Sequence, residues 1–110
     1  MSHNYQEPGD LNYLSKLSES AKNEFQAWLA LDRVVGREDG AIPRKYRELI
    51  ALSVALTTQC PYCIEVHVKA AKKAGASAQE VSETTFLAAA LRAGAAVTHG
   101  AMAMKLYEHP

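Results

Sequence analysis

Signals for β-strands are scarce in this sequence. β-branched residues are scattered, no run alternates apolar and polar side chains with a period of two, and the Asp39-Gly40 pair lies between helical patterns rather than between strands. The sequence therefore predicts an all-α fold of about five or six helices. A chain of 110 residues can bury one modest core, so we expect residues 1–110 to form a single domain.

Excess charge of either sign is also missing. Twelve basic side chains balance twelve acidic ones, which excludes attraction to nucleic acid or to an anionic membrane through net charge. The N-terminal stretch from Met1 to Asp10 is polar and lacks the basic start and apolar run of a signal peptide. We expect a cytoplasmic protein whose termini, with His3 and His109, are mobile and have no role in the site.

Strongly apolar runs of membrane-spanning length are lacking as well. The most apolar tract, Phe86 to Leu106, is dominated by alanine and contains Arg92 and His99, so we interpret it as buried protein and expect no membrane contact. Its apolar residues surround the helices instead of forming one stripe. Because a small monomer can hardly bury such elements on every side, the tract predicts a homo-oligomer.

Periodicity and capping residues define the expected helices. Apolar residues recur at helical intervals from about Ser18 to Val35, and Leu49, Leu52 and Leu56 follow Pro43 with the same spacing. Prolines favour the first turn of a helix, and Ser77-Ala78-Gln79-Glu80 is a capping box. The expected helices are about 18–35, 43–58, 61 to just before Gly75, one opening after Ser77, and a last one at 95–107 after a break near Gly94.

Cysteine is rare, with only two residues, which excludes a disulfide framework. Cys60 and Cys63 are three apart, so a disulfide between them closes too small a loop to stabilise the fold much. In a reducing compartment such a pair indicates catalysis, redox sensing or metal binding. At about 100° per residue, His67 falls on the same helical side as both cysteines, while Glu65 and Lys69 fall on the opposite side.

This stripe suits thiol redox chemistry. Only a thiolate attacks a peroxide or a disulfide, and the free N–H groups and dipole at a helix N-terminus favour the anion near Cys60. His67 lies one turn beyond Cys63 and can relay a proton. The spacing lets one cysteine attack while the other resolves the sulfenic acid or mixed disulfide.

Other interpretations stay open at this point. Both cysteines and His67 are suitable zinc ligands that Glu48 or water could complete, although one continuous helix makes a poor structural zinc site. The pair could also report oxidative state in a scaffold without useful turnover. His99 is either a buried structural histidine or a residue that reaches the site from another element or subunit.

The order of these residues resembles a known motif. Glu48, eleven intervening residues, Cys60-x-x-Cys63, three more residues and His67 closely resemble the core motif of the alkylhydroperoxidase D-like (AhpD-like) proteins of the carboxymuconolactone decarboxylase superfamily. The similarity runs from about residue 43 to 106. The family pattern has a histidine immediately before the second cysteine, where this chain has Tyr62.

The resemblance implies an all-helical homo-oligomer, a trimer or hexamer, that reduces small hydroperoxides with electrons from a dithiol or thiol-protein donor. It implies that Cys63 attacks the peroxide, that Cys60 resolves the product, and that Glu48 and His67 form a proton relay. No metal or flavin cofactor is implied, only a redox-active Cys60–Cys63 disulfide. The superfamily's lactone decarboxylases lack the cysteine pair, so decarboxylation is the less favoured alternative.

Overall fold

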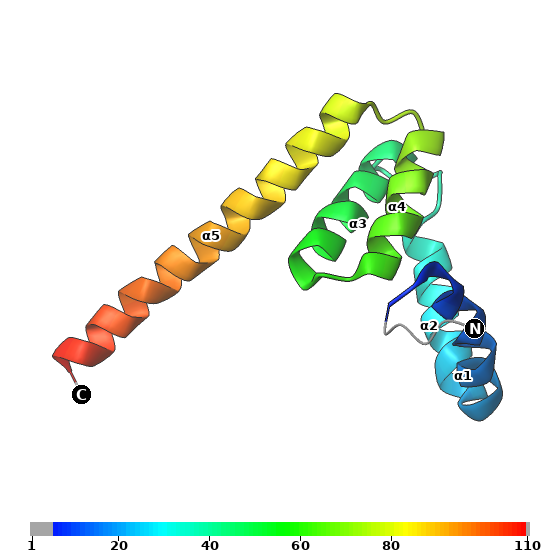
Figure 1. Ribbon diagram of the computed structural model, residues 1–110, viewed down its shortest axis with the longest axis horizontal. Helices are drawn as coiled ribbons and strands as arrows, with labels where there is room; N and C mark the ends of the chain where they lie inside the picture. The colour runs from blue at the N-terminus through cyan, green and yellow to red at the C-terminus, as the bar shows by residue number, and fades with distance from the viewer. Residues whose placement is uncertain (1–5, 110) are drawn as a thin grey trace.

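The described part of the chain, residues 6–109, consists of helices joined by short connections and contains no strand, which confirms the all-α prediction (Figure 1). We refer to this computed structural model as the structure. A 3₁₀ helix precedes five α-helices. In chain order the elements are η1 (Pro8–Tyr13), α1 (Leu14–Ser20), α2 (Lys22–Val35), α3 (Arg44–Thr58), α4 (Pro61–Lys73) and α5 (Ala78–Glu108).

The centre of the fold is the helical hairpin of α3 and α4. Gln59 ends α3 in the left-handed region with φ 57°, which turns the chain sharply enough for the next residue, Cys60, to be the N-cap of α4. Leu52, Ala55 and Ala71 are almost completely buried along the seam between the two helices. The predicted helix after Pro43 and the predicted start at Pro61 are both confirmed.

The predicted helix from Ser18 to Val35 is broken at Ala21, where φ is −137° and ψ is 64°. The break allows Leu14 and Leu17 of α1 to line a hollow together with Phe25 and Trp28 of α2. The rings of those two aromatic residues lie 5.7 Å apart. Helical hydrogen bonding persists on either side of the break: the Ala21 N–H donates to the Leu17 carbonyl, and the Phe25 N–H donates to the Ala21 carbonyl. Periodicity alone therefore cannot distinguish this bend from a continuous helix.

The predicted break near Gly94 is wrong, because α5 runs without interruption for 31 residues. A glycine in a helix costs only about 1 kcal/mol relative to alanine, and the neighbours Ala93, Ala95 and Ala96 are the strongest helix formers. No proline stands between Gly94 and the end of the helix at Glu108. The capping box at its start is confirmed: Ser77 Oγ accepts the Glu80 N–H at 3.0 Å, and Glu80 Oε1 accepts the Ser77 N–H at 2.9 Å.

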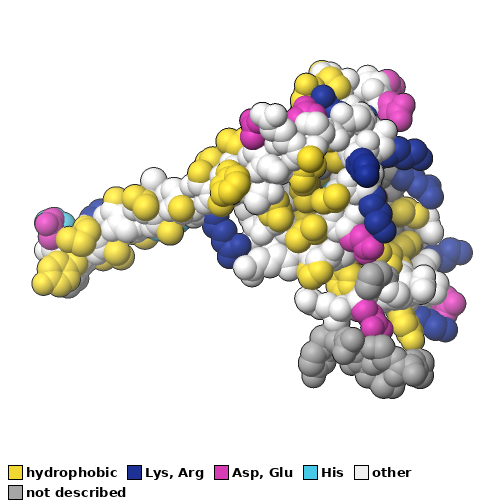
Figure 2. Space-filling view, turned by 45° about the horizontal axis from the view of Figure 1, so that its top comes forward, with side chains coloured by type: hydrophobic (Ala, Val, Ile, Leu, Met, Phe, Trp, Pro, Cys, Tyr) yellow, Lys and Arg dark blue, Asp and Glu magenta, His cyan; other side chains and the backbone are white. Residues whose placement is uncertain are grey.

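Most of α5 is not covered by the rest of the chain (Figures 1 and 2). Phe86, Leu91 and Val97 are 73%, 68% and 75% exposed, so the predicted burial of this tract is not achieved within one chain. His99, for which the sequence left a buried structural role or a role at the site from another element or subunit, is exposed and bonds the Ala95 carbonyl of its own helix. Length and composition alone would let α5 cross a membrane, but one such helix is weak evidence for a span.

Candidate active site

The hairpin brings the four predicted site residues together. Glu48 lies on the inner face of α3, Cys60 caps α4, and Cys63 and His67 follow on the face of α4 that is turned toward α3. The opposite face of α4 carries an exposed ion pair between Glu65 and Lys69, with 2.9 Å between Oε1 and Nζ, as the i,i+4 spacing predicts.

Glu48 is the polar centre of the site. Its side chain is 5% exposed and makes two charge-assisted bonds: Oε2 lies 2.7 Å from His67 Nδ1, and Oε1 accepts from Arg44 Nε, also at 2.7 Å. Burial raises the pKa of Glu48, but the bonds from His67 and Arg44 outweigh burial and leave that pKa below its usual value. Glu48 is therefore held as a buried carboxylate.

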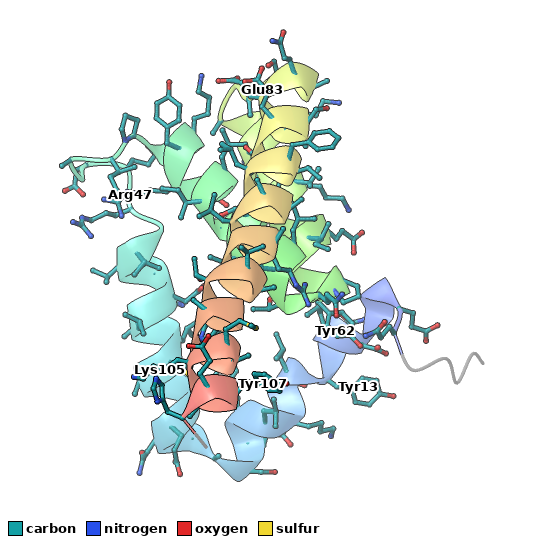
Figure 3. The ribbon with its side chains drawn as sticks, turned by 90° about the vertical axis from the view of Figure 1, so that its left-hand side faces the viewer. Tyr13, Arg47, Tyr62, Glu83, Lys105 and Tyr107 are labelled. Carbon is teal, nitrogen blue, oxygen red and sulfur yellow. The ribbon has the colours of Figure 1, made fainter. Side chains whose placement is uncertain are left out.

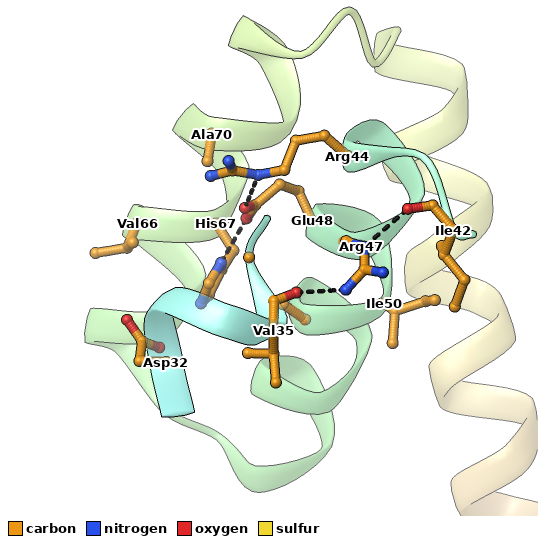
Figure 4. A pocket seen from close by; sticks show the side chains of 12 residues that line it. Asp32, Val35, Ile42, Arg44, Arg47, Glu48, Ile50, Val66, His67 and Ala70 are labelled. Atoms are coloured by element: carbon orange, nitrogen blue, oxygen red, sulfur yellow. Dashed lines mark hydrogen bonds and ion pairs between the residues drawn. The ribbon is translucent and has the colours of Figure 1, made fainter. Parts of the chain in front are cut away.

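The carboxylate fixes the orientation of the imidazole. Because Glu48 accepts the bond from Nδ1, the hydrogen of neutral His67 lies on Nδ1 and the lone pair lies on Nε2. Figure 4 shows the second ring nitrogen pointing away from Glu48, on the side where Asp32 lies. A histidine held in this way has a free nitrogen available to take a proton from a nearby thiol.

The two cysteine sulfurs are hydrogen-bonded to each other. Cys60 Sγ and Cys63 Sγ are 2.7 Å apart, and Cys60 Sγ also accepts the Cys63 backbone N–H at 3.4 Å. The bond with the Cys63 thiol, followed by the Cys63 and Tyr62 backbone N–H groups, lowers the pKa of Cys60. The same bond, with burial and the Cys60 charge, raises the pKa of Cys63 to about 11. When the pair carries a single negative charge, that charge therefore resides on Cys60 and the proton stays on Cys63.

A cavity of about 400 Å³ opens beside the imidazole (Figure 4). Glu48, His67 and Arg44 supply its polar side, and Val35, Ile42, Ile50 and Val66 are among its apolar lining. Such a mixture of apolar walls with a few convergent polar groups is typical of a small-molecule site. Of the four predicted site residues, Glu48 and His67 line this cavity, and Cys60 and Cys63 do not.

Arg47 holds the loop that forms one edge of this cavity. Its Nε donates to the Ile42 carbonyl and its Nη1 to the Val35 carbonyl, both at 2.8 Å. A Cβ at Gly40 would overlap the Arg47 guanidinium, so a larger residue there would displace the end of that side chain. Neither contact was predicted from the sequence, since a loop carbonyl leaves no pattern among side chains.

Tyr62, the residue that departs from the family pattern, binds the N-terminal segment. Its hydroxyl donates to Asp10 Oδ2 at 2.6 Å, and the same oxygen accepts the Glu7 backbone N–H at 3.1 Å (Figure 3). Asp10 thus belongs to η1 and is held beside the start of α4, whereas we expected Met1 to Asp10 to be mobile. The first five residues of that stretch lie outside the described residues.

The alternative of a zinc site receives no support from the geometry. Among residues 6–109, no group of three His, Cys, Asp or Glu side chains is arranged to hold a metal ion. His67 directs Nδ1 at Glu48 rather than joining it as a fellow ligand. His99 is not among the residues that line the cavity.

Comparisons with known proteins agree with this arrangement. The model of the carboxymuconolactone decarboxylase family matches residues 23–106. Uncharacterized protein 4 of the cox locus of Paracoccus denitrificans is 41% identical over 95 residues, which cover 86% of this chain and 85% of that protein. An uncharacterized protein of Haemophilus influenzae is 42% identical over 83 residues, which cover 76% of this chain and 73% of that protein.

A solved structure extends the likeness to three dimensions. The apo form of a carboxymuconolactone decarboxylase family protein from Legionella pneumophila superposes with a TM-score of 0.68 and 27% sequence identity. The match covers 90% of this chain and 88% of that one.

Proposed function

This chain belongs to the carboxymuconolactone decarboxylase family, and we propose that it is a thiol-dependent peroxidase of the alkylhydroperoxidase-like kind. The observation that carries the proposal is the buried Glu48–His67 pair, 2.7 Å between Oε2 and Nδ1, on the same helical hairpin as two hydrogen-bonded cysteines. A family relative without thiol chemistry has no use for a paired thiolate.

The reaction balances with the groups that the chain provides. A cysteine thiolate attacks one peroxide oxygen, so that an S–O bond forms, the O–O bond breaks and an alkoxide leaves, to be protonated to the alcohol. The second thiol then attacks the sulfenic sulfur, forming the Cys60–Cys63 disulfide and releasing water. The pair has lost two electrons to the peroxide, and an external dithiol returns them.

We assign attack to Cys63, which lies one turn from His67, and resolution to Cys60. Since hydrogen bonds place the resting charge on Cys60, the Cys63 proton moves across the 2.7 Å contact between the sulfurs before Cys63 attacks. His67, oriented by Glu48, takes a proton from solvent at Nε2 and passes it to the leaving alkoxide. The substrate is a small organic hydroperoxide whose apolar part occupies the cavity beside His67. A volume of about 400 Å³ is large enough for a compact ligand.

Peroxide turnover with a dithiol donor tests this function. Wild-type protein should consume an organic hydroperoxide catalytically, and both Cys60→Ser and Cys63→Ser should abolish turnover. A sulfenic-acid trap should label Cys63 in the Cys60→Ser variant and leave the Cys63→Ser variant unlabelled. Label on Cys60 alone would exchange the two roles, and a disulfide that forms without turnover would make the chain a redox-responsive scaffold.

A further inference from the structure

Three carboxylates lie on the segments next to the cysteine pair and to the cavity beside His67. Asp10 binds the hydroxyl of Tyr62, the residue between the two cysteines. Glu7 lines a crevice of about 90 Å³ with Gln6, Pro61, Tyr62 and Glu65, where the N-terminal segment meets the start of α4. Asp32 of α2 lines the cavity next to His67, and its charge contributes to the raised pKa of Cys63.

The Asp10 charge is fixed in place rather than carried on a free side chain. Its Oδ2 accepts from Tyr62 Oη at 2.6 Å and from the Glu7 N–H at 3.1 Å, which joins residues 52 positions apart in the sequence. The bond to Asp10, then burial, then the charges of Asp10, Cys60 and Glu7 raise the pKa of Tyr62. The Tyr62 hydroxyl is therefore within electrostatic reach of both the Cys60 sulfur and the Glu7 carboxylate.

The carboxylates act on an approaching reagent, whereas the N-terminus of α4 acts on the Cys60 sulfur itself. The backbone N–H groups at the start of α4 contact Cys60 Sγ directly and stabilise its own negative charge. Asp10 does not contact the sulfur; it is bonded to the Tyr62 hydroxyl, on which the Cys60 charge also acts. Glu65, which lines the crevice, is paired with Lys69, whereas the donors that the described residues offer to Asp10 are neutral.

We propose that the thiol or disulfide partner of the Cys60–Cys63 pair is neutral or cationic, and that Asp10, positioned by Tyr62, discriminates against anionic partners. The inference rests on the proposed function, because it names the chemical class of the electron donor. A donor protein that fits this surface presents basic residues around its own reactive thiol. Asp10 is a specificity-determining residue and takes no part in bond making.

The exchange step can be followed without any peroxide. The Cys60 thiolate attacks one sulfur of a disulfide R–S–S–R, forming a mixed disulfide and releasing RS⁻. Cys63 then attacks the Cys60 sulfur, forming the Cys60–Cys63 disulfide, releasing the second RS⁻ and giving up its proton. The two electrons that the pair loses reduce the reagent to two thiols, and regeneration by a dithiol is the reverse reaction.

Reduced full-length protein should be mixed with three disulfide probes that differ in charge: dianionic dithiobis(nitrobenzoate), neutral dithiodipyridine and dicationic cystamine. Asp10→Asn removes the charge but keeps an oxygen that can accept from Tyr62. One unit charge acting on a dianion about 9 Å away in water predicts roughly a fivefold faster reaction of this variant with the anionic probe at low salt. The neutral probe should react within twofold of wild type, and cystamine should react more slowly.

Two further variants separate charge from packing. Tyr62→Phe keeps the Asp10 charge but releases it, so the anionic probe should gain less than in Asp10→Asn, and the neutral probe should show whether the segment blocks access. Glu83→Gln removes an exposed charge near the start of α5, far from Tyr62 (Figure 3), and should match wild type with all three probes.

Equal changes for all three probes in Asp10→Asn would show a steric effect and overturn the proposal. So would an anionic rate that rises no more than the neutral one. This outcome is independent of peroxide turnover. Selection by charge without turnover would contradict the peroxidase function and support the role of Asp10. Turnover without selection by charge would support the peroxidase function and contradict the role of Asp10.

Discussion

At the scale of residues, the site depends on a carboxylate that is buried and yet ionised. Glu48 remains charged because Arg44 and His67 each occupy one of its oxygens. Arg44 was missed in the sequence, although its i,i+4 position relative to Glu48 was a readable signal. The Glu48–His67 contact itself needed the family motif, because a separation of 19 positions gives no local indication that the two side chains meet.

Removing either member of the relay should slow thiolate chemistry. In His67→Ala the site loses its proton carrier, and in Glu48→Gln it loses the charge that orients and supports the imidazole. We expect each variant to lower the thiol alkylation rate near neutral pH by about tenfold, which is less than the usual effect of losing a general acid or base because backbone N–H groups still stabilise the Cys60 thiolate. The measurement is alkylation rate against pH. Unchanged profiles in both variants would reduce these residues to packing roles.

Glu48 should also make stability depend on pH in acid. Its pKa in the folded chain lies below its ordinary value of 4.5, so its contribution to the free energy of unfolding is complete above that value. The contribution is lost as the pH falls through the lower, folded-state pKa. Urea unfolding below pH 4.5 should therefore show a shallower loss of stability with falling pH in Glu48→Gln than in wild type. Equal slopes would place the carboxylate in ordinary solvent.

At the scale of elements, local signals were sufficient where a cap or a proline marks a boundary. Pro61 and the Ser77–Glu80 box predicted the starts of α4 and α5 because their hydrogen bonds are made within one turn. The Asp10–Tyr62 bond joins residues too far apart for any pattern to predict. Gly94 was taken as a break because its low propensity was weighed without the alanines around it.

The start of α5 should be sensitive to its cap. Ser77→Ala removes the acceptor for the Glu80 N–H and weakens the position of Glu80, whose Oε2 lies 3.0 Å from Lys45 Nζ on α3. We expect a loss of about 1 kcal/mol in the free energy of unfolding, measured by urea titration. Thr98→Ala, which removes an exposed hydroxyl from the interior of α5, is the control and should not lower stability. An equal free energy of unfolding for Ser77→Ala and Thr98→Ala would show that the cap does not stabilise the protein.

At the scale of the whole molecule, one chain is more extended than a compact monomer of the same length. Its Cα radius of gyration is 18.1 Å, against roughly 13 Å for a compact domain of this length. Its accessible surface is 8713 Å², against about 6,000 Å² for a folded monomer of 12.0 kDa. The excess is of the size that obligate subunit interfaces bury, and the exposed apolar residues of α5 provide it.

We therefore expect stable self-association through α5, as predicted from the sequence. Light scattering on dilute protein without detergent should give a multiple of the 12.0 kDa chain mass. Leu91→Glu, which places a charge on an exposed apolar position of α5, should shift the mass downward, whereas Lys105→Glu on the same helix should have a smaller effect. A stable monomer would contradict this interface. Protein that stays in solution only with detergent would point to a membrane instead.

The most direct test of the thiol mechanism is mass spectrometry of the peptide that carries both cysteines, after treatment with one equivalent of an organic hydroperoxide. The account predicts a loss of two hydrogens within that single peptide, from an intramolecular Cys60–Cys63 disulfide, and slower formation in His67→Ala. Two cysteines that stay free thiols, or that oxidise independently to sulfinic acids, would contradict it.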